Sequence, residues 1–338
     1  MTSHQSHQSA ARSAVRINRF DMTPHVIREE PSSQTSVRHA VVKVTHASVG
    51  VTDAMAARGD YLLHPFPGFT PGYDLVGRVQ QLPEGDNSGL AVGQRVVALL
   101  PGMGAHATTV RVSPSLLVAL PESVDELAAA TVPLDALTAH FALQISASDG
   151  GSVLIQGAGG AVGAWATQMA VNHGITVVGT GSSRSAAYAE SLGAREIYDY
   201  RDHHWMDQLQ RQFPGGVDGV IDHTGSRDVR EAAKPTGIIV RTAFGGPVGH
   251  QRAATARGMV TTSLLRWAHP RERICSVPVL VALRRGRYRR ALSQILKEVA
   301  DGLLKPPEPE VFTLDGYAQA LAAASHGRPG IKLVLRLD

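Results

Sequence analysis

The stretch SVLIQGAGGAVGAWATQMAVNHGITVVG, residues 152–179, decides the fold class of this chain. It reads as a buried strand, a glycine turn, a helix and a second buried strand. The helix carries apolar or small residues at helical spacing: Val162, Trp165, Ala166, Met169 and Ala170. Two further strand-then-turn units, DGVIDHTG and PTGIIVRTAFGG, follow along the chain. Strands that alternate with helices predict a parallel, doubly wound sheet, so we expect an α/β fold.

The glycine turn has a spacing that suits a dinucleotide. Gly157, Gly160 and Gly163 recur at every third position, although Val162 stands where a strict G-x-G-x-x-G motif has its last glycine. Such glycines permit a tight turn and a close approach of the backbone to a pyrophosphate. The next helix directs its N-terminal amides, equivalent to about half a positive charge, at the phosphates. We therefore expect the cofactor to contact the whole loop: Gly157, Ala158, Gly159, Gly160, Ala161, Val162 and Gly163.

The residues after the second strand favour NADPH over NADH. An NAD site usually ends this strand in Asp or Glu, which binds the ribose 2′-hydroxyl. Here Thr180, which we place in the cofactor site, leads into Ser182, Ser183 and Arg184, and the first acid is Glu190. Hydroxyl donors and a guanidinium suit a 2′-phosphate, which an acid would repel. The alternative interpretation is an exposed loop with a helix cap and a solvated arginine.

The rest of the chain divides by composition. From Val15 to about residue 120 it is β-rich, with Gly- and Pro-rich turns. We expect a helix over 288–304, and we expect RPGIKLVLRL, near the end, to form a strand that completes the first β unit. Residues 1–14 are polar and low in complexity, which is typical of a disordered tail.

Length and composition exclude several classes of function. With 338 residues, 43% hydrophobic and 18% charged, the chain has room for two domains and the make-up of an ordinary globular protein. Its one cysteine, Cys275, permits no intramolecular disulfide and no cysteine zinc cluster, so we expect a reducing, cytoplasmic setting. Its apolar runs are too short to span a bilayer. The arginine-rich segment 266–290 lacks a series of stacking aromatic residues, so we interpret it as a solvated helix face and expect no nucleic-acid partner.

Five segments, taken in their order and spacing, resemble a known superfamily. They are TPGYDLVGRV (70–79), VPLDALTAHFAL (132–143), IQGAGGAVG (155–163), LGAREIYDY (192–200) and GRPGIKLVL (327–335). The chain resembles the medium-chain dehydrogenase/reductase superfamily, and within it the zinc-independent quinone oxidoreductase (zeta-crystallin-like) branch. The resemblance implies a GroES-like β-rich catalytic domain, residues 15–127 and 266–338. It also implies a Rossmann nucleotide-binding domain with a doubly wound parallel sheet, residues 128–265, and often a homodimer.

The resemblance also implies roles for residues outside the glycine loop. Tyr200 and Arg328 would join Ser183 and Arg184 around the 2′-phosphate. Further cofactor residues are expected at Thr224, Gly225, Phe244 and Gly245, the last two by the nicotinamide, and Thr138 is expected near its ring.

The catalytic segment departs from the zinc-dependent relatives. Their three catalytic zinc ligands match Gly50, Tyr73 and Leu134, none of which is a credible zinc ligand, so we expect no metal. The zinc-independent branch typically has Asn at the position of Gly50 and often Tyr near Met55, whereas Asp53 and Tyr61 match. We therefore expect a smaller, more apolar cleft for an electrophilic small molecule, lined by Gly50, Asp53, Met55, Tyr73 and Asp135.

These residues lead to a hypothesis for the reaction. NADPH would reduce an activated C=C bond in an enone, enoyl or quinone-like substrate, with Tyr61 as the first candidate proton donor and Thr138 as a weaker one. The alternative for Tyr61 is a packed ring with a solvated hydroxyl. Asp135 is expected to be a helix surface acid, and Asp53 to pair structurally.

Two other functions stay open from the sequence. One is a one-electron quinone reductase, and the other is an NADPH-binding scaffold or regulatory protein with little turnover. The remaining acid of the cleft segment, Asp74, is expected to be structural, paired with an arginine or with backbone amides at a turn.

Overall fold

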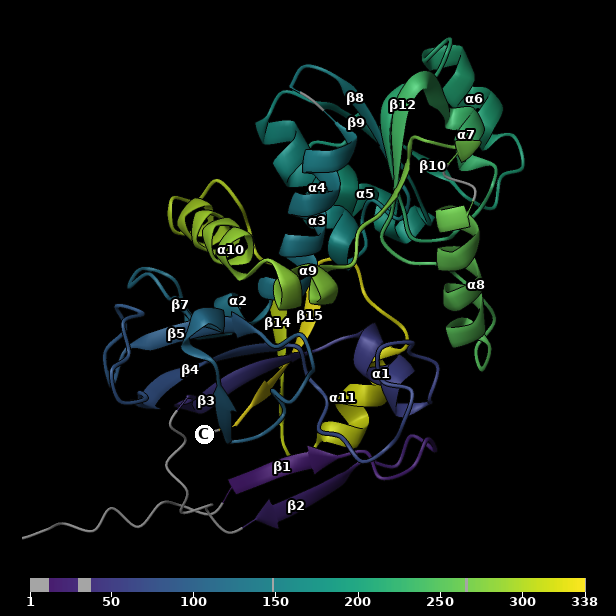
Figure 1. Ribbon diagram of the computed structural model, residues 1–338. Helices are drawn as coiled ribbons and strands as arrows, with labels where there is room; N and C mark the ends of the chain where they lie inside the picture. Colours follow the sequence, from purple (N-terminus) through teal and green to yellow (C-terminus); the bar gives the residue numbers. More distant parts are fainter. Residues whose placement is uncertain (1–11, 30–37, 148, 265–266, 338) are drawn as a thin grey trace, which may run out of the picture.

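The computed structural model describes residues 12–29, 38–147, 149–264 and 267–337. Figure 1 shows two parts, a β-rich part in its lower half and a part built on a parallel sheet above it. The predicted α/β fold is therefore confirmed.

The parallel sheet has the strand order of a doubly wound nucleotide-binding fold. Its strands, in spatial order, are β10 (Glu196–Asp199), β9 (Thr176–Gly181), β8 (Ser152–Ile155), β11 (Val217–Asp222), β12 (Ala233–Arg241) and β13 (Glu272–Ile274). All neighbouring strands are parallel. The order reverses at β8, and ligands of such sheets bind at that point, beyond the carboxyl ends of the strands.

Helices cover both faces of this sheet. They are α3 (Pro133–Ser146), α4 (Ala161–Asn172), α5 (Ser183–Ser191), α6 (Trp205–Gln212) and α7 (Val229–Ala232). Helix α8 (Gln251–Leu264) lies near β13 and buries none of its residues. Alternate strand residues point to opposite faces, so Val153 and Val177 pack in the core that includes α3 and α4. Leu154 and Val178 pack in the second core, with α6 and α7. Burial on both faces explains the nearly continuous apolar runs of these strands.

The β-rich part is built from segments at both ends of the described chain. Its sheet follows the order β14 (Glu308–Thr313), β15 (Ile331–Arg336), β3 (Ala40–Val49), β4 (Asp74–Gln81), β5 (Arg95–Leu99) and β7 (Val118–Ala119), and β6 (Thr109–Val112) also pairs with β3. The C-terminal strand β15 lies antiparallel to β3, with Leu335 opposite Ala47. The strand predicted for RPGIKLVLRL (328–337) therefore does complete the first β unit, as β15.

Two expected boundaries differ from the structure. The hairpin of β1 (Arg12–Arg16) and β2 (His25–Glu29) begins inside the expected tail 1–14, and residues 1–11 lie outside the described part. Strand β13 belongs to the parallel sheet, although the expected end of that domain is residue 265. These three strands are short, so their pairing, rather than their sequence pattern, assigns them.

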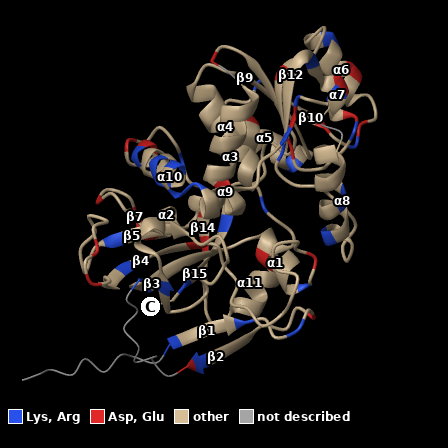
Figure 2. Cartoon of the chain, viewed as in Figure 1, with Lys and Arg blue, Asp and Glu red and all other residues tan. Residues whose placement is uncertain are grey.

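Five further helices within the described residues connect and cover the two parts. They are α1 (Val51–Ala57), α2 (Glu126–Ala130), α9 (Val277–Leu283), α10 (Arg285–Ala300) and α11 (Tyr317–Ala324), with a 3-10 turn at Pro114–Leu116. Helix α10 buries Tyr288, Leu292 and Ile295, and Figure 2 shows Lys and Arg along its outer surface. Within the described residues, helices are all too short or too polar to cross a membrane.

Candidate active site

The glycine loop joins β8 to α4 at the carboxyl edge of the parallel sheet. Gly160 caps α4 and offers no side chain to the amides of the first helical turn. A Cβ on Gly159 would lie 2.3 Å from the carbonyl oxygen of Ser185, so only glycine lets the loop pack this closely on α5. Amides at a helix N-terminus beside a bare backbone are the donor set that a pyrophosphate takes. The loop therefore fits a dinucleotide.

Thr180 holds this loop in place from the neighbouring strand β9. Its hydroxyl accepts a hydrogen bond from the amide of Gly157 at 3.2 Å and donates one to Oε1 of Gln156 at 2.5 Å. Its carbonyl accepts from the amide of Ala158 at 3.0 Å. These contacts of Thr180 fix the loop conformation.

The end of β9 presents a cation and hydroxyls. Ser182 caps α5 in a reciprocal arrangement with Ser185, whose hydroxyl accepts from the Ser182 amide at 2.9 Å. Ser183 and Arg184 follow in the exposed first turn, and Arg184 has no hydrogen bond or ion pair within the described residues. The predicted helix cap and the solvated arginine are both present, and the arginine stays available to an anion.

An acid that the sequence analysis overlooked lies beside this turn. Asp199 pairs in register with Gly181, the last residue of β9. Hydrogen bonds from the side chain and the backbone of Arg201 lower the pKa of Asp199 to about 2, and the side-chain bonds measure 2.9 and 2.6 Å. Tyr200 between them is 58% exposed. The carboxylate is thus already engaged by a guanidinium.

A carboxylate at the end of β11 organises the next loop. Asp222, fully buried, accepts hydrogen bonds from the amide and hydroxyl of Thr224 at 3.1 and 2.6 Å and from the amide of Gly225 at 2.8 Å. The amide of Gly245 donates to the carbonyl of Thr224 at 2.8 Å, which brings the Phe244 segment alongside. The structure therefore brings together four residues that the sequence analysis assigns to the cofactor site, two of them by the nicotinamide.

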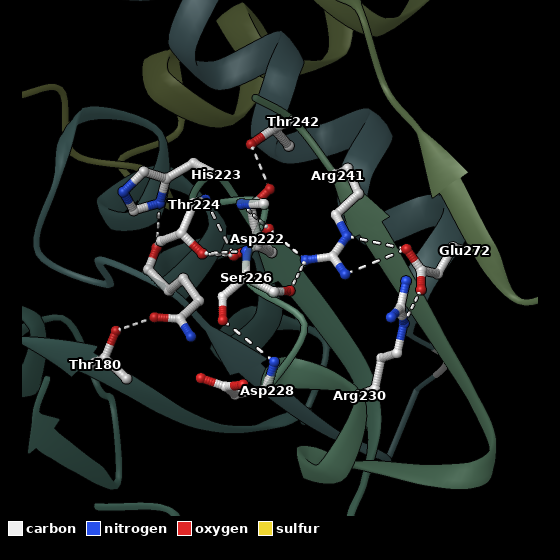
Figure 3. A network of polar contacts seen from close by, with 12 residues as sticks. Thr180, Asp222, His223, Thr224, Ser226, Asp228, Arg230, Arg241, Thr242 and Glu272 are labelled. Atoms are coloured by element: carbon white, nitrogen blue, oxygen red, sulfur yellow. Dashed lines mark hydrogen bonds and ion pairs between the residues drawn. The ribbon is translucent and has the colours of Figure 1, made fainter. Parts of the chain in front are cut away.

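Asp222 is one end of a buried chain of charges, shown in Figure 3. Arg241, at the end of β12 and 2% exposed, lies 2.7 Å from Asp222 and 3.2 Å from Glu272 on β13. Arg230 of α7 pairs with the other oxygen of Glu272. Arg241 also donates to the carbonyl of Ser226 at 2.8 Å. The alternating charges tie three strand ends and the cofactor-side loop into one unit.

Arg328 approaches α4 from the β-rich part. It pairs with Glu310 of β14 and lines a cavity together with Tyr188 of α5 and the start of α4, Gly160 and Ala161. The C-terminal segment thus reaches the nucleotide loop, as the resemblance implies for a cofactor contact.

Asp53 is buried and holds the backbone of the catalytic segment by hydrogen bonds. Its carboxylate accepts from the amide of Gly50, which caps α1, and from the amide of Gly72, both at 2.8 Å. Gly72 has a φ of 94°, and a Cβ there would lie 2.3 Å from the His106 ring, so glycine is required. The structure therefore supports a structural role for Asp53. Met55 follows on α1 and is partly exposed.

Two phenols meet in this region. The hydroxyl of Tyr73 donates to the hydroxyl of Tyr61 at 2.9 Å, and the rings cross at 83°. Burial raises the pKa of Tyr61 to about 12, although the bond from Tyr73 opposes the shift. Burial also raises the pKa of Tyr73. Tyr61 is therefore protonated at neutral pH and has its own proton free to donate.

Asp74 has partners that the sequence analysis gave only in part. It is fully buried and accepts from the hydroxyl of Ser48 at 2.8 Å and from the amide of Leu134 at 3.0 Å. Within the described residues its hydrogen-bond partners are thus a hydroxyl and one backbone amide, so of the two expected alternatives the amide is present and the arginine is not. Burial raises the pKa of Asp74 to about 7. The carboxyl links β3, β4 and α3 beneath the cleft.

Asp135 is not the surface acid that the helical pattern suggested. It is 7% exposed and forms a 2.5 Å ion pair with Lys332 of β15, a residue that the sequence analysis missed. Thr138, one turn further on α3, donates its hydroxyl to the carbonyl of Leu134 at 2.7 Å. Asp135 and Lys332 both line the cavity that contains the start of α4. The described residues include no group of three or more His, Cys, Asp or Glu side chains placed to hold a metal ion.

Comparisons with known proteins match both parts of the chain. Residues 37–122 match the family model described as the alcohol dehydrogenase GroES-like domain, and residues 161–259 match the one described as zinc-binding dehydrogenase. A quinone oxidoreductase of Pongo abelii is 28% identical over 216 residues, 62% of this chain and 65% of the relative. The trans-enoyl reductase himH of Aspergillus japonicus is 33% identical over 210 residues, 56% of this chain and 60% of the relative. These alignments thus span less than two thirds of each relative.

Solved structures agree over nearly the whole chain. The quinone oxidoreductase of Coxiella burnetii has a TM-score of 0.79 at 25% identity and covers 97% of this chain and 99% of its own. The CurK enoyl reductase has a TM-score of 0.78 at 20% identity, covering 96% and 99%, and shows the fold alone. Together with the parallel sheet and its glycine loop, the family implies a nicotinamide cofactor. The chain belongs to the medium-chain dehydrogenase/reductase superfamily, in its quinone oxidoreductase-like branch.

Proposed function

We propose that the protein is an NADPH-dependent, zinc-independent reductase that transfers a hydride to an activated C=C bond. Its substrate would be an enone, an enoyl compound or a quinone-like molecule. The quinone oxidoreductases and the enoyl reductase that the chain resembles support this class of reaction.

NADPH, when bound, supplies the hydride, and this chain supplies the binding site. The amides at the start of α4 would hold the pyrophosphate. Arg184 and Ser183 would bind the 2′-phosphate, with Tyr200 and Arg328 from neighbouring segments. The preference over NADH is supported by the unpaired Arg184 and by Arg201, which engages the nearest carboxylate.

The observation that carries the proposal is the set of polar groups near the positions that match zinc ligands. The three positions that match zinc ligands hold Gly50, Tyr73 and Leu134, and the polar groups around them are a pair of phenols and an ammonium–carboxylate pair. Such groups stabilise charge on a substrate oxygen and deliver protons. Reduction of a conjugated C=C bond needs both and needs no metal ligand.

Tyr61 is the residue to which we assign proton delivery. Its hydroxyl accepts a bond from Tyr73, so its own proton points away from that partner. A phenol with a pKa of about 12 stays protonated through the neutral range. It can give its proton to the α-carbon after hydride has reached the β-carbon, and water can then reprotonate it.

The test is NADPH oxidation, followed by absorbance, against a panel of enones, enoyl thioesters and quinones. We expect turnover with conjugated C=C substrates, and a fall of about 10²- to 10⁴-fold in Tyr61→Phe, since general acid catalysis contributes on that order. Tyr198→Phe, which removes a phenol from the opposite side of the parallel sheet, is the matched control. If NADPH binds but no acceptor oxidises it, the protein is a binding protein. If only quinones react, with release of semiquinone, it is a one-electron reductase.

A further inference from the structure

Lys332 is a buried cation that the proposed reaction has not yet used. It lies on β15 with 8% of its side chain exposed, and its Nζ contacts Oδ2 of Asp135 on α3 at 2.5 Å. The pair joins the β-rich part to the helix that enters the nucleotide part. A buried ion pair is weak evidence for stability by itself, because desolvation offsets much of the attraction. The position of the ammonium is therefore a better guide to the function of Lys332 than the ion pair itself.

The ammonium lies beside Gly50, one of the three positions that match zinc ligands. A Cβ placed on Gly50 would be 3.5 Å from Nζ, so Lys332 borders the space where the quinone oxidoreductase pattern has an Asn side chain. Its partner Asp135 directly follows Leu134. Asp74, which directly follows Tyr73, acts on the same ammonium through its charge. A fixed positive charge thus occupies the region from which both the metal ligands and the amide are missing.

Two donors of this ammonium are unused. A lysine ammonium has three N–H donors, and Asp135 takes one. The remaining two have no hydrogen-bond partner within the described residues. Buried donors without acceptors are costly, so an acceptor from outside the chain is expected at this place. The cavity that Lys332 lines also contains Gly160 and Ala161, which places the ammonium between position 50 and the nucleotide loop.

The charge of Lys332 is secure. Burial alone would lower its pKa, but the carboxylates of Asp135 and Asp74 outweigh that effect, and the pKa is raised overall. The ammonium is therefore present wherever the protein is folded at neutral pH.

We propose that Lys332 is a catalytic residue whose ammonium binds the carbonyl oxygen of the substrate and stabilises the negative charge that forms there. The proposal rests on the proposed reductase function and narrows its substrates to α,β-unsaturated carbonyl compounds. In the step, the β-carbon gains the hydride with its two electrons, and the π electrons of the C=C bond shift to give an enolate. The enolate oxygen accepts a hydrogen bond from Nζ, and the α-carbon then takes a proton from Tyr61. Asp135 is a positioning residue, since it holds Nζ in place.

The test uses para-nitrophenol, whose phenolate is a conjugated oxyanion with its own absorbance band. It is titrated into the complex of the full-length protein with NADP⁺, so that no turnover is needed. We expect the wild-type complex to bind the phenolate form, and we expect Lys332→Met to weaken that binding by about tenfold or more, as for loss of a buried oxyanion donor. Lys297→Met, which removes an exposed lysine of α10, should change nothing.

Folding is controlled by a second variant. Lys332→Met leaves Asp135 buried and unpaired, so the double variant Asp135→Asn/Lys332→Met, which carries neither charge, repeats the measurement. It should show the same loss of phenolate binding, whereas Asp135→Asn alone, which keeps the ammonium, should lose less. Equal phenolate binding in the wild type and the double variant would overturn the proposal.

Kinetics separate this inference from the proposed function. At saturating NADPH, kcat with an enone should fall by about 10²- to 10³-fold in Lys332→Met, while the affinity for NADP⁺ changes by less than about threefold. A large loss of NADP⁺ affinity with kcat unchanged would assign Lys332 to the cofactor phosphates and contradict the proposal. If wild-type protein reduces enones and the variant does so equally well, the inference fails alone. If the wild type reduces none, the proposed function fails and the role of Lys332 falls with it.

Discussion

Replacing Arg241 by Met should destabilise the nucleotide part and weaken cofactor binding at the same time. The change keeps an apolar side chain of similar length but removes the charge between Asp222 and Glu272. It also removes the donor that holds the carbonyl of Ser226. The loop after β11 would then lose its anchor to β12.

The expected loss of unfolding free energy depends on the partners that Asp222 and Glu272 keep in the variant. Breaking a buried ion pair by removing one partner costs about 3–5 kcal/mol. Glu272 keeps Arg230, and Asp222 keeps donors from the Thr224 loop, so we expect the lower end, about 3 kcal/mol. The double variant Arg241→Met/Glu272→Gln should recover part of this loss, because it removes the charge of one of the two buried acids that lose Arg241.

The assay is urea unfolding with and without NADPH, followed by tryptophan fluorescence, since Trp165 is buried in α4. Lys297→Met removes an exposed cation that also pairs with an acid, far from the cofactor site, so it should leave the unfolding curve nearly unchanged. NADPH affinity is measured in parallel by fluorescence titration. An Arg241→Met variant with the stability and the NADPH affinity of the wild type would refute the reasoning.

Two further variants test the cofactor end and the cleft floor. Arg184→Ala should weaken NADPH binding by about tenfold or more and leave NADH binding nearly unchanged, because only NADPH carries the 2′-phosphate. Fluorescence titrations measure both affinities, and Arg195→Ala, which removes an exposed arginine at the opposite end of β10, is the control. An equal loss of affinity for both cofactors would contradict the assignment. Asp74→Ala should reduce stability more than catalytic activity, because it leaves the Ser48 hydroxyl and the Leu134 amide without their acceptor, a loss of about 1–3 kcal/mol of folding free energy for each. Thermal unfolding and turnover assays measure the two effects, and a stable but inactive variant would overturn this prediction. The folded-state pKa of Asp74 lies near 7, above its unfolded value, so this carboxyl increasingly opposes folding as pH rises from about 4 to 7. The stability of Asp74→Asn relative to the wild type should therefore increase between pH 5 and pH 8. A stability difference that stays constant with pH would refute the pKa shift.

The local pattern was sufficient to predict the nucleotide part. Alternating buried strands, a glycine turn and helical periodicity depend on near neighbours in sequence, and they predicted β8, α4 and β9 directly. The strand near the C-terminus and its return to the first β unit were also expected from the pattern, whereas its partner strand β3 was not specified.

The long-range polar pairs could not be predicted in the same way. Asp135 and Lys332 are 197 positions apart, and a helical acid reads as exposed unless its partner is known. The link between Asp222 and Arg241 did have a signal. Both residues end adjacent parallel strands, and an arginine that closes the apolar run GIIVR needs a partner.

The most direct test is the fate of deuterium from NADPH labelled at the transferable C4 position. It is incubated with the protein and an α,β-unsaturated carbonyl compound, and the product is read by NMR. We predict one deuterium at the β-carbon of a saturated carbonyl product, with the hydrogen at the α-carbon drawn from solvent. Deuterium on a carbinol carbon, or no transfer to any conjugated acceptor despite bound NADPH, would contradict reduction of a C=C bond.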